Sequence, residues 1–235
     1  MKEKHEVTYY VLFSIIAVFL LMVLIYFGVS NKQLIRFYDK LLIGGLFIAS
    51  CLFGISLAFF PGWYKKILKP DISNAYIKND KVVLRKRIGH HPDCDSFKNH
   101  VIAFGENFLC TGCLGLAIGS FISILLILIY LVFSYGNSSF VFYLFFFFGL
   151  IMIAFNFIEI MFPVRNKYVH IFSNSLIVLG FFLIIIGIFE LTASTSYAII
   201  SLIFSFLFLI TRIQLSHRKH SLICKLCSKK CKMYQ

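Results

Sequence analysis

The chain contains few charged residues, and most of them are basic. Only 14% of its 235 residues are Asp, Glu, Lys or Arg, and ten of these are acidic. An ordinary soluble domain is about a quarter charged and about 45–50% apolar, whereas this chain is 60% apolar. The shortage of charge argues against a soluble domain. It predicts a membrane protein, because the apolar residues fall in long uninterrupted runs.

The signatures of several enzyme and transporter classes are also missing from the sequence. It has no nucleotide-binding loop, no Ser/His/Asp set and no pair of carboxylates arranged for hydrolysis. No charged residue is expected near a bilayer midplane, and no pair of Gly/Pro-interrupted spans marks an inverted repeat. We therefore prefer a non-catalytic protein, although membrane enzymes can assemble sites from scattered polar residues.

Six apolar runs are long enough to cross a bilayer as helices of about 20 residues. The expected fold class is an all-α integral membrane protein with a small Cys/His-rich loop between the second and third helices. Residues 1–61 would hold the first two spans, 62–113 the loop, 114–213 four further spans and 214–235 a basic tail. The predicted spans are Tyr9–Val29, Leu41–Phe60, Leu114–Phe133, Phe140–Phe162, Val169–Glu190 and Ser196–Ile213.

Lys and Arg gather on one side of the predicted membrane. The two termini, the long loop and the connection before the fifth span hold 20 of the 23 basic residues. Basic segments stay cytoplasmic, so both termini and the loop are predicted to face the cytoplasm from a plasma membrane. We therefore attribute the net charge of +13 to basic residues that orient the spans in the membrane, and not to nucleic-acid binding. The expected partners are the bilayer, anionic lipid at the basic tail, and a membrane-protein partner or second copy of the chain.

Six of the seven cysteines fall in two groups on this predicted cytoplasmic side. Two thiolates from one tight C-x-x-C turn can chelate a metal, and His or Cys from upstream can complete a tetrahedron. A short polar loop rarely folds around a hydrophobic core of its own, and a bound structural metal is one common way to stabilise such a segment. We expect zinc, with iron as the alternative. A redox-active dithiol and residues with no ligand role stay open as well. The loop candidates are His90, His91, Cys94, His100, Cys110 and Cys113.

The tail group offers four soft ligands within twelve residues. Its candidates are His220, Cys224, Cys227 and Cys231. A metal site competes here with a basic segment that binds anionic lipid or is acylated. The seventh cysteine, Cys51, lies alone within the second span and is expected to be a small apolar packing residue.

Polar residues near the cytoplasmic ends of the fourth and fifth spans form two pairs at helical spacing. The connection between these spans is short, so the pairs could form a polar pocket beneath the Cys/His loop, with Arg165 and Lys167 as partners for Glu159. The alternative is that all of them lie at the membrane interface, where water solvates polar groups and their free-energy cost is small. The pocket candidates are Asn156, Glu159, His170 and Asn174.

The start of the third span carries a recognisable pattern. It resembles a family of small polytopic membrane proteins, known mainly as a domain of unknown function in bacteria and archaea. The family signature is Cys-His, Pro, an acidic residue, Arg-Ser-Phe and then C-x-x-C-x-G-x-x-x-G entering the next span. The matching residues are His90, Pro92, Phe97, Cys110, Cys113, Gly115 and Gly119.

The chain also departs from that signature. Gly89 stands where the family has its first cysteine, Asp95 replaces the family arginine, and Cys94 lies on the other side of the proline. Either Cys94 replaces the lost ligand or the site differs. The resemblance covers about 30 of 235 residues and implies a Cys/His membrane protein of unassigned activity.

Three functions follow as hypotheses. The preferred one is a membrane-anchored zinc protein whose cytoplasmic lobe is a structural or partner-docking module. The second is a thiol–disulfide or electron-transfer protein using Cys110 and Cys113, although such enzymes suit an oxidising compartment. The third is a metal-ion transporter, for which the spans offer few ligands, namely Cys51, Met152, Glu159, Met161 and His170.

Overall fold

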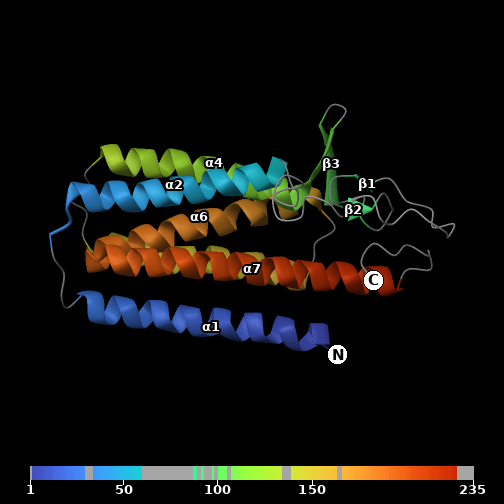
Figure 1. Ribbon diagram of the computed structural model, residues 1–235, viewed down its shortest axis with the longest axis horizontal. Helices are drawn as coiled ribbons and strands as arrows, with labels where there is room; N and C mark the ends of the chain where they lie inside the picture. The colour runs from blue at the N-terminus through green and yellow to red at the C-terminus, as the bar shows by residue number, and fades with distance from the viewer. Residues whose placement is uncertain are drawn as a thin grey trace, which may run out of the picture.

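Six long helices make up most of the structure, a computed structural model that describes residues 2–29, 34–59, 87–88, 91–92, 97, 100–104, 107–133, 139–162 and 166–226 (Figure 1). Side chains are described for 8–29, 34–59, 97, 100–102, 109–133, 139–162 and 166–223. The helices are α1 (Lys2–Val29), α2 (Phe37–Phe59), α4 (Thr111–Val132), α5 (Ser139–Met161), α6 (Lys167–Thr192) and α7 (Thr195–Leu226).

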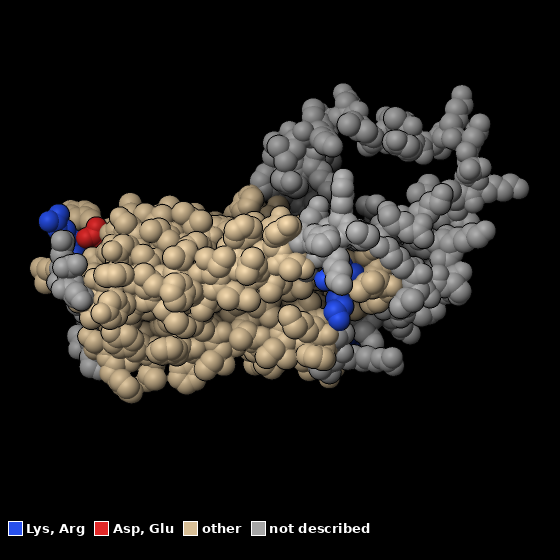
Figure 2. All heavy atoms as spheres, turned by 90° about the horizontal axis from the view of Figure 1, so that it is seen from below, with Lys and Arg blue, Asp and Glu red and all other residues tan. Residues whose placement is uncertain are grey.

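Within the described residues, all six helices are long and apolar enough to cross a membrane. Figure 2 shows the described charged residues at the two ends, with a broad uncharged band between them. Large apolar side chains such as Phe19 and Ile151 are more than 60% exposed on the bundle surface. Lipid accepts such a surface and water does not. The prediction of a helical protein with six helices long and apolar enough to cross a membrane is therefore confirmed.

The last helix is longer than the sequence predicts. The sixth span was expected to end at Ile213, but α7 continues to Leu226, so the first part of the predicted tail is helical. Tertiary contacts hold these polar turns in place. Lys219 Nζ donates to the carbonyl oxygen of Met161 at 3.0 Å, and Ser221 is buried.

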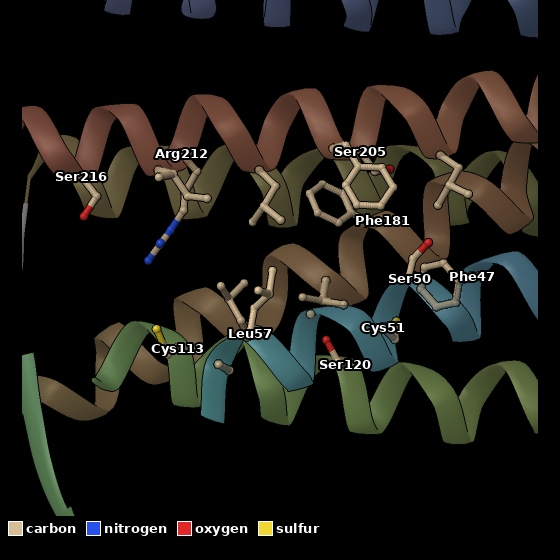
Figure 3. A pocket seen from close by; sticks show the side chains of 18 of the residues that line it. Phe47, Ser50, Cys51, Leu57, Cys113, Ser120, Phe181, Ser205, Arg212 and Ser216 are labelled. Atoms are coloured by element: carbon tan, nitrogen blue, oxygen red, sulfur yellow. The ribbon is translucent and has the colours of Figure 1, made fainter. Parts of the chain in front are cut away.

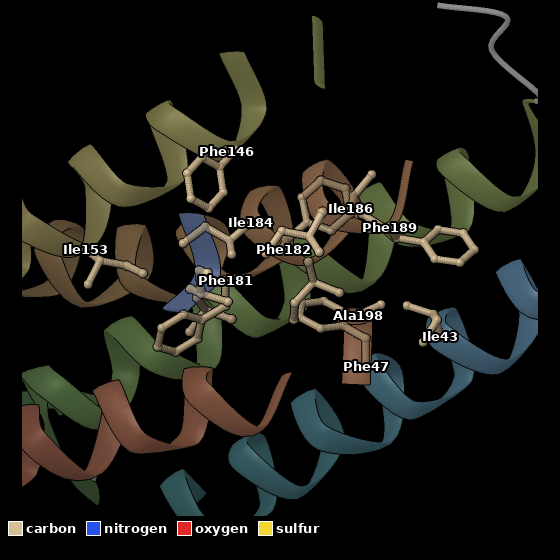
Figure 4. Packing of buried hydrophobic residues seen from close by; sticks show 14 of the residues in the cluster. Ile43, Phe47, Phe146, Ile153, Phe181, Phe182, Ile184, Ile186, Phe189 and Ala198 are labelled. Atoms are coloured by element: carbon tan, nitrogen blue, oxygen red, sulfur yellow. The ribbon is translucent and has the colours of Figure 1, made fainter. Parts of the chain in front are cut away.

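Helix α6 lies at the centre of the bundle. About 72% of its spanning window is buried, against 22–33% for the other five helices. It packs against α5, α4, α7 and α1, and Phe182 also meets Phe47 of α2 at 6.0 Å between ring centroids. Figure 4 shows Phe146, Ile184 and Phe189 among the side chains packed in this core. The polar residues of α6 are therefore placed among side chains from several other helices.

Two glycines let α4 approach this central helix closely. A Cβ on Gly119 would lie 2.5 Å from the carbonyl oxygen of Ser175, and one on Gly115 would overlap the carbonyl oxygen of Ile171. Small residues at this spacing allow helix backbones to meet in a membrane. Ser175 Oγ also donates to the carbonyl oxygen of Gly115 at 2.9 Å. These glycines fix the start of α4 against the start of α6.

Two short hairpins lie at one end of the bundle. Strands β1 (Arg87–Ile88) and β2 (His91–Pro92) pair antiparallel, as do β3 (Val101–Phe104) and β4 (Asn107–Cys110). Both described chain ends lie at this same end (Figure 1). We call it the Cys/His end, defined by β3, β4, the first turns of α4 and α6, and α7 beyond Thr211. The other end, which carries Lys40 and Glu190, is the opposite end.

Candidate functional site

The C-x-x-C pair occupies a strand-to-helix turn. Strand β4 ends at Cys110, which is the N-cap residue of α4 in extended backbone conformation, with φ −68° and ψ 130°. Cys113 therefore lies within the first turn of α4, because the helix begins at Thr111 and not at Leu114, where the sequence analysis placed its start. Both residues carry thiols and not a disulfide, and the two thiols are hydrogen-bonded to each other. Cys110 is buried and Cys113 is half-buried.

The β3–β4 pairing holds His100 beside this turn. Val101 is paired with Cys110 in the hairpin register, and Thr111 Oγ1 donates to the carbonyl oxygen of His100 at 3.3 Å. Phe97, which is almost fully buried, packs against the His100 ring with centroids 5.8 Å apart. The loop histidine is thus fixed by backbone pairing on one side and an aromatic contact on the other.

Three histidines from distant parts of the chain meet at the Cys/His end. The ring centroid of His100 lies 5.3 Å from that of His170 on α6 and 5.3 Å from that of His220 on α7. Phe97 also meets His220 edge-on at 5.1 Å. The loop candidate, the tail candidate and the pocket candidate therefore belong to one cluster.

A carboxylate from α5 orients His170. The Nδ1 atom of His170 lies 3.0 Å from Glu159 Oε1 and 3.2 Å from Glu159 Oε2, and Glu159 is buried. The other ring nitrogen, Nε2, points toward the cysteine turn, because it lies 3.5 Å from the Cβ position of Gly112. The two polar pairs were proposed to be neighbours across the α5–α6 connection, and Glu159 and His170 are indeed in contact there, although Arg165 and Lys167 were the partners proposed for Glu159.

The remaining pocket candidates are buried beside this pair. Asn156 Nδ2 donates to Ser173 Oγ at 2.9 Å, and Asn174 Nδ2 donates to the carbonyl oxygen of His170 in its own helix. The Oδ1 atoms of both asparagines have no hydrogen-bond partner among the described residues. Lys167 does not pair with Glu159 and lies over the Tyr168 ring. Arg165 falls outside the described residues.

The sequence analysis missed Arg212 as a site residue. It is only 7% exposed, and its guanidinium Nη2 lies 3.0 Å from the Cβ position of Gly112. It interacts electrostatically with Cys110, Cys113 and Glu159. The available signal was an ionisable residue at the end of an apolar run. Because the sixth span was expected to end one residue later, Arg212 was assigned to the membrane boundary.

Not every predicted ligand lies in the described part of the chain. The structure brings His100, Cys110, Cys113 and His220 to one end of the bundle and adds His170. Within the described side chains, no group of three or more His, Cys, Asp or Glu is placed to hold a metal ion. Cys51 is buried in the core, as expected of a packing residue. The side chains of His90, His91, Cys94, Cys224, Cys227 and Cys231 lie outside the described residues.

Comparison of the chain with protein-family models, with curated proteins and with solved structures finds no match in any of the three. The family resemblance therefore stays a prediction that rests on the motif residues alone.

Proposed function

We propose that this chain is a multi-pass membrane protein that binds a soft transition metal, zinc in the first place, at its Cys/His end. The observation that carries the proposal is the Glu159–His170 pair. Metal-binding histidines commonly donate one ring N–H to a carboxylate and present the other nitrogen to the metal. His170 has this arrangement, with Nδ1 against Glu159 and Nε2 toward the cysteine turn.

The donor chemistry near His170 suits zinc, with iron as the alternative. Thiolate sulfur and imidazole nitrogen are the usual zinc donors, and four of them form a closed structural site. Among the described side chains at this end, Cys110, Cys113, His100 and His220 supply such donors. Arg212 would offset the negative charge of two thiolates.

The described side chains do not by themselves form a ready ligand group. The proposal therefore requires either movement of these side chains or further donors from His90, His91 and Cys94, whose spacing the sequence supplies. A metal bound here would tie the loop to α4, α6 and α7. The lobe would then serve as a structural or partner-docking module, and no step of catalysis is assigned to it.

We place this end in the cytoplasm of a plasma membrane. The support is the 20-to-3 division of Lys and Arg between the two predicted sides. A fluorescent or reporter fusion at each terminus tests this orientation, since both termini should report from the cytoplasm. A reporter that is active only outside would contradict it.

Elemental analysis of detergent-purified protein tests the metal proposal. Wild-type protein should contain about one zinc per chain, and Cys110→Ser and Cys113→Ser should lose most of it. Cys51→Ser is the matched control, because Cys51 is a buried thiol outside the cluster, and it should keep its zinc. Wild-type protein without stoichiometric zinc or iron would contradict the proposal, as would equal loss in the Cys51 variant.

A redox-active dithiol is the second candidate, and one observation favours it. The Cys110 and Cys113 thiols are hydrogen-bonded to each other at the first turn of a helix, beside the buried Arg212. Alkylation by maleimide separates the two candidates. A metal site should react only after a chelator is added. A redox pair should react only after a reductant is added to the protein as isolated.

A further inference from the structure

A cavity of about 390 Å³ lies between α2, α4, α6 and α7 (Figure 3). This volume falls within the usual range of small-molecule sites, about 300–1,000 Å³. One end of the cavity touches the proposed metal site, through Cys113, Arg212 and His220. The cavity proposal shares these residues with the metal proposal but does not require a bound metal.

Most of the cavity wall is apolar. Such a wall binds hydrocarbon, because burying apolar surface is favourable and non-directional. Small side chains from α2, α4 and α7, including Cys51, Ser120 and Ser205, leave the space that larger residues would fill. The main apolar lining residues are Leu57, Leu116, Val178, Phe181, Leu202 and Leu209.

One end of the cavity is polar and cationic. Arg212 lines it together with Ser216 and His217, and Figure 3 shows the Arg212 guanidinium projecting from α7 into the space on the side of Cys113. Arg212 is nine-tenths buried, and its Nε has no hydrogen-bond partner within the described part of the chain. A buried guanidinium needs acceptors, and an oxyanion supplies them in the matching geometry.

The cavity also reaches the lipid-facing surface of α7. Phe206 and Ile213 line it, and they are 40% and 47% exposed on the outside of the bundle. They are seven residues apart, so they lie on one face of the helix. An occupant can therefore enter sideways from the bilayer.

We propose that this cavity holds one acyl chain of an anionic phospholipid, with the phosphate bound at Arg212. The lateral opening lets the second acyl chain remain in the bilayer, which favours a phospholipid over a free fatty acid. The site is an interior one, and Ser216 and His217 from the first turns of the predicted tail contribute to its polar end. Charge complementarity is supplied by Arg212, and Ser216 and His217 add polar groups at the same end.

Native mass spectrometry of the delipidated full-length protein tests this site. Dioleoyl phosphatidylglycerol, dioleoyl phosphatidylcholine and oleate are added separately. Both phospholipids carry the phosphate, but the choline cation of phosphatidylcholine offsets its negative charge, so wild-type protein should retain a single phosphatidylglycerol about tenfold more tightly. Arg212→Gln should lose the preference, and Arg212→Lys should keep most of it.

Two glycines of α2 give a matched pair of filling variants. A Cβ on Gly54 meets only Ser120 Oγ, at 3.7 Å, so Gly54→Leu fills the cavity without a clash at Cβ. A Cβ on Gly45 meets nothing within 4 Å, and Gly45 does not line the cavity. Gly54→Leu should therefore lose the tightly held lipid, whereas Gly45→Leu should bind as wild type does.

Three results would overturn the proposal: equal retention of the two phospholipids by wild type, equal lipid binding by the two glycine variants, or tight binding of oleate alone. Zinc is measured in the same samples. Gly54→Leu protein that keeps zinc and loses lipid supports the cavity site. Wild-type protein that holds lipid and lacks zinc also supports it, and contradicts only the metal proposal.

Discussion

The two ends of the bundle differ in whether their buried polar groups have partners within the protein. At the opposite end, Lys40 Nζ lies 3.1 Å from Glu190 Oε1, and Tyr130 donates to the same oxygen. Lys40 also lies over the Tyr130 ring, 5.0 Å from its centroid. This cluster joins α2, α4 and α6, and its charges are met by side chains of the protein itself.

At the Cys/His end, several buried polar atoms have no hydrogen-bond partner among the described residues. Five buried side-chain atoms in the described part of the chain have no hydrogen-bond partner, and four of them lie at or near this end: Asn156 Oδ1, Asn174 Oδ1, Arg212 Nε and Ser221 Oγ. Native structures satisfy nearly all buried polar groups, so each exception calls for an explanation. The proposed metal and lipid sites would account for the unsatisfied atoms at the Cys/His end, whereas the opposite end needs no ligand to account for its charges.

The largest predicted effect comes from the helix contact that assembles the Cys/His end. Gly119→Leu places a side chain against the backbone of Ser175, so α4 and α6 must separate. We expect destabilisation by about 3 kcal/mol, together with loss of bound metal. Thermal unfolding in detergent measures it, with Gly45→Leu as the control. An unchanged melting temperature would show that this close contact is not required.

The second prediction compares a carboxylate from each end. Glu159→Gln removes the charge that orients His170 and should weaken zinc binding about 10- to 100-fold. Glu190→Gln makes the same chemical change next to Lys40 and should leave zinc affinity unaltered. Competition with a zinc chelator measures both variants. Equal effects at the two ends would remove the distinction between them.

A smaller effect is expected from the ion pair at the opposite end. Lys40→Met leaves Glu190 buried with the Tyr130 hydroxyl as its one remaining side-chain donor among the described residues, so stability should fall by about 1.5 kcal/mol. Zinc content should not change. Unfolding measurements and elemental analysis of the same sample test both statements. Loss of zinc from this variant would mean that the two ends are coupled through α6.

The smallest predicted effect is that of Tyr130→Phe. The substitution removes one hydrogen bond to Glu190 and keeps the ring beneath Lys40, so it should destabilise by about 1 kcal/mol. Combining it with Lys40→Met gives a double-mutant cycle. Strictly additive effects would show that Lys40 and Tyr130 do not act on Glu190 together.

Hydropathy predicted the helices well, because a bilayer demands long apolar runs whatever the tertiary structure. The prediction failed for α7, where Lys219 and Ser221 continue the helix past Ile213. Those polar turns are helical because they pack against α5 and the loop, and such contacts between distant segments leave no trace in a hydropathy window.

The sequence identified most residues of the candidate site, but it did not predict that the loop, pocket and tail residues lie together in one cluster. Cys110, Cys113 and His220 were found from ligand-like spacing, and the Glu159–His170 pair from a short connection between spans. The meeting of loop and tail histidines depends on how α4, α6 and α7 pack. The burial of Arg212 depends on the same packing, so neither could be derived from local sequence.

X-ray absorption at the zinc edge of the purified full-length protein tests the central claim most directly. The proposal predicts a tetrahedral site with both sulfur neighbours, at about 2.3 Å, and nitrogen neighbours, at about 2.0 Å. The sulfur contribution should weaken in Cys110→Ser and stay intact in Cys51→Ser. A protein without bound metal, or a metal surrounded only by oxygen, would contradict the proposal that the Cys/His end is a metal site.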